Sequence, residues 1–259
     1  MIIPELVSST ISHNREIFGI TLEMYAYLEL VSRGTFNSLP GSDGFLPSSI
    51  SRVLDLVGNF DTCGFLFGIG FDLFNLFPRV CDLRQNRLMQ RTEVECSDQT
   101  VVQYYQELEQ TIRSWQPPRD PLVDKDPEDQ SMDLVMVAQM YQQAMLIFLH
   151  ASFHTATSEL DVLQAKIAGI IPEMFCVLRI LSSTVSTTMI WPLMMVGSFL
   201  RDSAIQEELR IMFRKDPSRS RISRLAVQLL EWVWDDESAF GLSGLDAMVK
   251  HHAVDFCFT

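Results

Sequence analysis

The sharpest candidate for chemistry in the chain is a pair of histidines four residues apart. His150 and His154 end the apolar segment 147–154, for which helix is predicted, so both imidazoles lie on one helical face, as in zinc-dependent proteases. In those sites a glutamate general base directly follows the first histidine, where this chain has Ala151. Glu159 is near enough along the chain to be a third ligand. The apolar surroundings nevertheless favour structural histidines over a metal site.

Other catalytic motifs are missing from the sequence. There is neither a Gly-x-Ser-x-Gly elbow nor a Walker loop, and the Gly-Ser-Asp-Gly at 41–44 is typical of a turn. The glycines at 64, 68 and 70 do not spell a dinucleotide fingerprint, and no strand pattern precedes them. The adjacent His251 and His252 cannot direct both rings to one helical face. We therefore expect no catalytic residue, no cofactor and no enzymatic activity.

Charge argues against a general affinity for nucleic acid. The chain carries 33 acidic and 20 basic residues, a formal net charge of -13, which repels phosphate backbones. One local reversal exists, and it consists of Arg210, Arg214, Lys215, Arg219, Arg221 and Arg224. A nucleic-acid or nuclear-import role is conceivable for this run, but a solvated corner between two helices is the favoured interpretation.

Cysteine usage and apolar segments bear on the compartment. The five cysteines are unevenly spaced, without a Cys-x-x-Cys pair, as expected of reduced thiols in a cytosolic or nuclear protein. The N-terminus does not have the pattern of a secretory signal. Residues 180–200 contain no charged side chain, and a segment of this length can span a bilayer. Their many hydroxyl groups, together with Pro192, favour a buried helix instead, and we expect no membrane association.

The periodicity of apolar residues predicts helices almost throughout. Thr21 can cap a first helix, with Ile20 and Tyr25 at the positions of a hydrophobic staple. Glycine, proline and charge predict internal loops at 33–47 and 116–133. The phenylalanines of residues 64–83, which from Phe67 onward recur three to four residues apart, indicate a core helix rather than an aromatic ligand box.

The later helices are predicted with clearer signals. The helix that begins at residue 134 becomes apolar all round from Ala144 to Leu149 and belongs at the centre of a bundle. Ser203 and Gln206 have the form of a capping box. A further amphipathic helix ends around Asp235, and period-two alternation is confined to residues 254–258. We predict a single all-α domain over 1–259, an irregular multi-helix bundle of packed helical hairpins.

Four segments of the chain resemble a known family. They are residues 16–21, 76–83, 141–150 and 191–197, the last reading Trp-Pro-Leu-Met-Met-Val-Gly. Their order and spacing are similar to those of the fungal-specific transcription factor domain, the helical regulatory region of zinc binuclear cluster transcription factors. The resemblance marks Trp191, Pro192 and Gly197 as structural motif residues. The small, acidic, small triplet usual after the glycine is replaced here by Ser-Phe-Leu.

The resemblance implies a nuclear regulatory protein, with the cytoplasm as the alternative, that acts through a protein partner, a homodimer or a small apolar effector. The family's zinc cluster requires Cys-x-x-Cys pairs, and this chain has none, so we expect no direct DNA binding by it. Three origins of the chain stay open. It is a fragment of a longer regulator, truncated at its N-terminus, or a shortened paralogue, or a domain used for another purpose. The rivals are a stand-alone helical binding protein and a recruited catalyst of fungal secondary metabolism, with an apolar pocket lined by residues such as Phe71, Phe74 and Met145.

Overall fold

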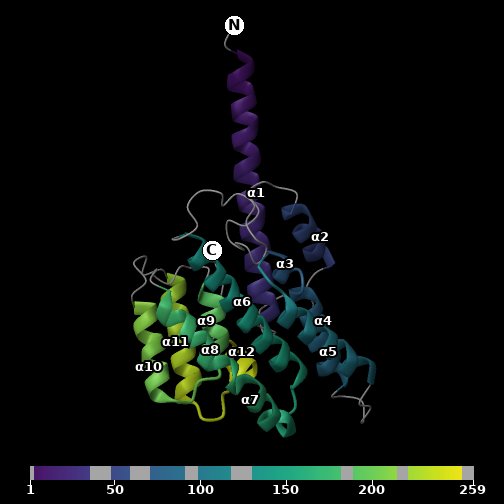
Figure 1. Cartoon of the computed structure of the whole chain (residues 1–259). Helices are drawn as coiled ribbons and strands as arrows, with labels where there is room; N and C mark the ends of the chain where they lie inside the picture. The colour runs from purple at the N-terminus through teal and green to yellow at the C-terminus, as the bar shows by residue number, and fades with distance from the viewer. Residues whose placement is uncertain are drawn as a thin grey trace.

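The computed structural model describes residues 3–35, 48–58, 71–90, 99–117, 130–181, 189–214 and 221–252. These ranges consist of helices and short connections, and no strand occurs in them, so the all-α prediction is confirmed. The helices, shown in Figure 1, are α1 (Ile3–Thr35), α2 (Ser48–Val57), α3 (Phe71–Phe74), α4 (Phe77–Gln90), α5 (Gln99–Ser114), α6 (Gln130–Phe153), α7 (Leu160–Ala168), α8 (Ile170–Ile180), α9 (Ile190–Gly197), α10 (Ser203–Arg214), α11 (Arg221–Asp235) and α12 (Gly241–His251).

Helix α6 lies at the centre of the bundle, as its sequence predicts. It contacts α4, α5, α7, α8, α9 and α12, and Figure 1 shows it between the α4–α5 side and the α10–α11 side. The side chains from Ala144 to Leu149 are all buried, because a helix surrounded by others has no face left for solvent. Helices α5, α10 and α11 each bury one stripe against α6 or its neighbours, whereas α9 is buried on all sides.

Helix α1 begins far earlier than the sequence suggests. Thr21 is not its cap, since the residue lies inside the helix and its hydroxyl donates to the carbonyl of Ile17 at 2.7 Å. Tyr25, predicted to staple the helix start, is exposed. A threonine hydroxyl can donate to a carbonyl inside a helix as readily as it can accept a free amide at the helix start. The residue type alone therefore did not show where α1 begins. The N-terminal half of α1 extends beyond the bundle (Figure 1).

Three further helix ends differ from the expectation. The predicted loops at 33–47 and 116–133 are helical at their edges, because α1 continues to Thr35 and α6 starts at Gln130; their middles, like residues 254–258, lie outside the described ranges. Helix α10 is capped by Asp202 and not by Ser203, since the Asp202 carboxylate accepts the amides of Ala204 at 2.8 Å and Ile205 at 3.3 Å. Aspartate competes well for this role. The predicted end of α11 at Asp235 is confirmed.

An aromatic cluster forms the middle of the core. Trp191 on α9 is 1% exposed and stacks on Tyr141 with ring centroids 6.0 Å apart. The rings of Phe74, Phe77 and Phe148 surround it at centroid distances of 6.4, 5.3 and 6.2 Å. In the described part of 64–83, Phe74 and Phe77 are therefore core residues, as predicted, whereas Phe71 is half-buried and packs against the core. Phe65 and Phe67 lie outside that part.

The charge-free segment belongs to this core. All eight residues of α9 are buried, and within residues 180–200 the structure describes the end of α8 at Ile180 and the separate helix α9. In the part of the chain that the structure describes, no helix has both the length and the apolar character that a bilayer span requires.

Candidate functional site

The family-motif residues make packing contacts. The indole N–H of Trp191 donates to the Thr35 hydroxyl at 3.1 Å, and Pro192 is fully enclosed in the first turn of α9, where a missing amide leaves no carbonyl unsatisfied. Tyr141, stacked on Trp191, shares a 3.3 Å hydroxyl hydrogen bond with Tyr27. Burial raises the pKa of Tyr27 to about 12. These polar groups hold α1, α6 and α9 together.

Gly197 permits the closest approach of α9 to its neighbours. A Cβ atom at this position would lie 2.8 Å from a methyl group of Leu230 and 2.9 Å from one of Leu209. Its carbonyl accepts the indole N–H of Trp234 at 2.8 Å. A glycine is required here because the absence of a side chain lets α10 and α11 pack directly on α9.

The Ser-Phe-Leu that departs from the family pattern joins α9 to α12. The carbonyl of Ser198 accepts the amide of Gly241 at 2.9 Å, and Phe199 meets Phe240 edge to face at 5.1 Å. Gly241 has a φ of 58°, and a Cβ there would collide with the Phe199 ring. This junction forms one wall of a cavity described below.

The histidine pair lies at the C-terminal end of α6. His150 is buried and its Nδ1 is 2.9 Å from the hydroxyl of Tyr105 on α5. Helix α6 ends at Phe153, so His154 is just outside it, although its amide still bonds the His150 carbonyl at 2.9 Å. Four buried side-chain atoms here have no hydrogen-bond partner among the described residues: His150 Nε2, Ser152 Oγ and both ring nitrogens of His154.

Burial keeps these imidazoles neutral. It lowers the pKa of His150 to about 4, against a smaller opposing effect of Glu109, and it also lowers the pKa of His154. Neutral imidazoles can bind metal, but the described residues include no group of three or more histidine, cysteine or acidic side chains that could hold an ion. Glu159, the third ligand considered from the sequence, is bound by Arg87 at 2.9 Å.

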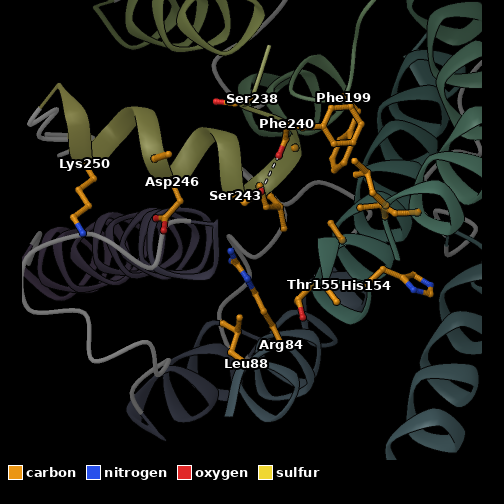
Figure 2. A pocket seen from close by; sticks show the side chains of 17 residues that line it. Arg84, Leu88, His154, Thr155, Phe199, Ser238, Phe240, Ser243, Asp246 and Lys250 are labelled. Carbon is orange, nitrogen blue, oxygen red and sulfur yellow. Dashed lines mark hydrogen bonds between the residues drawn. The ribbon is translucent and has the colours of Figure 1, made fainter. Parts of the chain in front are cut away.

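A cavity of about 460 Å³ opens beside the end of α6. Its walls come from α4, α6, α7, α12, Phe199 and the segments before α7 and α12, and Figure 2 shows the side chains that line it. Arg84 approaches from α4, and Asp246 and Lys250 from α12. His154 lines one edge, with its ring turned away from the centre of the cavity in Figure 2. The cavity is the candidate functional site.

Sequence reasoning missed the charged residues of this site. Arg84 follows Phe77, Val80 and Cys81 on the buried face of α4, so an arginine at a core-facing position was the available signal. Asp246 and Lys250 gave no signal, because charged residues on a terminal helix are common. Of the residues considered for an apolar pocket, Phe74 and Met145 are completely buried in the core and Phe71 is half-buried, and none of the three lines this cavity.

The basic run occupies the end of α10 and the start of α11. Arg210 lies 3.0 Å from Glu207 and 3.4 Å from Glu231, and Arg214 lies 3.4 Å from Glu207. Arg221 and Arg224 are exposed, whereas Lys215 and Arg219 are outside the described ranges. Arg210 and Arg214 are thus ion-paired on the surface of α10, and the turn between α10 and α11 lies outside the described ranges.

Comparison with family models gives a match over nearly the whole chain. The model of the fungal specific transcription factor domain matches residues 2–254. Neither the curated proteins nor the solved structures give a match. The four segments that carry the resemblance in the sequence all fall within the matched range.

Proposed function

The chain belongs to the fungal specific transcription factor domain family, and we propose that it is the regulatory, non-DNA-contacting part of a nuclear transcription regulator that acts as a dimer. The observation that carries this proposal is the extent of the family match, residues 2–254. The family supports a regulatory role in a fungal transcription factor. The acidic charge of -13 and the ion pairs of the basic run support a DNA contact made outside this chain.

The dimer contact that we propose is the exposed apolar face of α1. Ile17, Phe18, Met24 and Tyr25 are 51%, 59%, 46% and 49% exposed. They form two pairs spaced seven residues apart, the repeat by which helices pair in coiled coils. Because every copy carries the same repeat, a second copy of this chain is the occupant whose spacing matches it.

The position of α1 supports this arrangement. Its 33 residues correspond to a helix of about 50 Å, and its N-terminal half stands clear of the bundle (Figure 1). Two such helices can lie along one another over the half of α1 that stands clear of the bundle. Pairing also removes large apolar side chains from water, which stabilises association.

The regulatory role is tested by fusing the chain to an unrelated DNA-binding domain in a fungal host. We expect nuclear accumulation of the tagged chain and a change in reporter expression that needs the cognate operator. A fusion that enters the nucleus but leaves the reporter unchanged under all growth conditions would contradict the proposal.

The dimer is tested with purified protein by sedimentation equilibrium. Replacement of Ile17 and Met24 by glutamate is expected to raise the dimer dissociation constant by about tenfold or more, because two like charges then face each other across the contact. The matched control makes the same replacement at Val162 and Ile180, equally exposed apolar residues on α7 and α8. It is expected to leave the dimer dissociation constant unchanged. A monomeric wild-type chain would refute the dimer.

A recruited catalyst is the second candidate, because the cavity reaches His154. It is separated from regulation by deleting the gene and measuring transcripts and metabolites together. Altered transcripts support regulation. Unchanged transcripts with a lost metabolite support catalysis.

A further inference from the structure

We propose that the cavity between α4, α6, α7 and α12 binds a small uncharged molecule that is apolar over most of its surface and carries one group that hydrogen-bonds to Thr155. This inference rests on the proposed function and deepens it, because it names the chemical class of effector that the regulatory domain would take. It also gives a place in the fold to the small apolar effector that the resemblance implies.

Apolar side chains from three helices and one turn meet around the cavity. They are Leu88 of α4, Leu160 and Leu163 of α7, Leu242 of α12, and Phe199. Leu163, Phe199 and Leu242 are buried members of the hydrophobic core, so the core itself forms this wall. A wall of this kind favours the transfer of an apolar molecule out of water. The volume of about 460 Å³ falls within the range of roughly 300–1,000 Å³ common for small-molecule sites.

Both sides of the cavity are held in place by contacts within the chain. On one side, Arg87 donates to the Phe153 carbonyl and to the Glu159 carboxylate, each at 2.9 Å, and the same carboxylate accepts the Ala156 amide at 3.3 Å. These contacts fix the connection between α6 and α7. The opposite side is fixed by the junction of α9 and α12 described above. A preformed site of this kind binds a ligand without first having to be ordered.

The charged groups of the cavity already act on one another. Arg84 is only 7% exposed and donates to the Thr35 carbonyl at 3.2 Å. Burial lowers the pKa of Arg84, and the nearby Cys81 and Asp246 oppose this effect. Figure 2 shows Arg84 reaching from α4 toward α12, which carries Asp246, whereas Lys250 is exposed and stays hydrated. An ion of either sign would therefore lose its hydration without gaining an unopposed opposite charge.

One hydroxyl of the lining can still donate to a ligand. Of the three hydroxyl side chains there, Ser238 donates to the Asp236 carboxylate at 2.6 Å and Ser243 to the Phe240 carbonyl at 3.0 Å. The half-buried side chain of Thr155 has no hydrogen-bond partner among the described residues. A hydroxyl both donates and accepts, so an alcohol or a carbonyl group on an otherwise apolar molecule suits this position.

Calorimetric titration of the purified full chain tests the proposal with three probes that share one ring system: menthol, the cation menthylamine and the anion menthane carboxylate. We expect menthol to bind at least about tenfold more tightly than either ion, because neither ion recovers its lost hydration in the cavity. Tighter binding of either ion, equal binding of all three, or binding of none would overturn the proposal.

A first substitution tests the hydrogen bond. Thr155→Val keeps the shape of the side chain and removes its hydroxyl, so it is expected to weaken menthol binding by about fivefold. Thr111→Val, on α5 and outside the cavity, is the matched control and should bind menthol as wild type does. Undiminished binding to Thr155→Val would refute the role of its hydroxyl.

A second substitution tests the cavity itself. Ala247 lines it from an exposed position on α12, so Ala247→Trp should abolish menthol binding while the melting temperature stays within about 2 °C of wild type. Arg224→Trp, at an exposed position on α11, is the matched control and should bind menthol normally. Undiminished binding to Ala247→Trp would exclude this cavity.

The failure of this inference and that of the proposed function are distinguishable. Binding is measured on the isolated chain, whereas regulation is measured by the reporter fusion. A chain that regulates without binding menthol refutes only this inference, and a chain that binds without regulating refutes only the proposed function.

Discussion

The middle of α6 and its C-terminal end are both buried, but they differ in whether their buried polar groups are hydrogen-bonded. In the middle, Tyr141 stacks on Trp191 and bonds Tyr27, and the indole of Trp191 bonds Thr35. At the end, His150, Ser152 and His154 carry buried polar atoms without hydrogen-bond partners among the described residues, next to a cavity.

The difference separates stability from function. A buried polar group stabilises the fold only when it is bonded, and it destabilises the fold by about 1–3 kcal/mol when it is not. The middle of α6 is therefore built for stability. The end retains unsatisfied groups and an opening, the pattern expected where a site is kept at some expense of stability.

The largest effect should come from the aromatic cluster. Trp191→Ala removes the ring at its centre and is expected to lower the free energy of unfolding by about 3–5 kcal/mol. Denaturant unfolding measures the loss. The matched control, Trp232→Ala, removes a half-buried indole that stacks on His252 at 3.6 Å, and should lower it by about 1 kcal/mol. Equal losses would show that the cluster is not the centre of stability.

The tight approach of α9 should give the next effect. Gly197→Ala places a methyl group within 3 Å of Leu209 and Leu230, and overpacking of this kind lowers the free energy of unfolding by about 1–3 kcal/mol. Gly169→Ala is the control, because its Cβ meets nothing within 4 Å and its φ is -78°. There we expect a gain of about 0.4–1 kcal/mol. A neutral Gly197→Ala would contradict the packing role of this motif residue.

The histidine end should make stability depend on pH. His150 has a folded pKa of about 4, below the ordinary 6.5, so between these values the unfolded chain binds the extra proton. Its contribution to stability is complete above about pH 6.5 and is lost toward pH 4, with a slope of about 1.4 kcal/mol per pH unit. Unfolding followed over this range should show a shallower slope for His150→Gln.

His251→Gln is the control, because it removes an exposed imidazole that lies away from Tyr105, the partner of His150. If His150→Gln and the wild type fall in parallel as the solution is acidified, the buried neutral histidine is not responsible.

The smallest effect should be the difference in the free energy of unfolding between alanine variants of two buried serines. Ser198 donates to the Met195 carbonyl at 2.9 Å, and Ser198→Ala is expected to lower the free energy of unfolding by about 0.5–1.5 kcal/mol. Ser152 has no such partner among the described residues, so Ser152→Ala should change it by less than about 0.5 kcal/mol, or raise it. Thermal unfolding of both variants decides; the reverse order would contradict the difference between Ser198, whose hydroxyl is bonded after α9, and Ser152, whose hydroxyl has no partner among the described residues.

Local patterns predicted most of the fold but few of its boundaries. The apolar run at 144–149 predicts a central helix because neighbours along a helix report their own burial, and α6 is that helix. Thr21 and Ser203 fit the composition of caps, but α1 passes through the first and Asp202 replaces the second. Several nearby residues could make the same hydrogen bond, and only the packed helices select among them.

The site depended far more on tertiary structure. The sequence by itself determined an all-helical chain, a central α6 and the family motif, since each is written within one segment. Only the folded chain decided that Arg84, Asp246 and Lys250 line one cavity, that His154 falls outside α6, and that Gly197 lets Leu209 and Leu230 approach α9. These residues come together from α4, α6, α9 and α12, and periodicity along one helix carries no record of which other helix will face it.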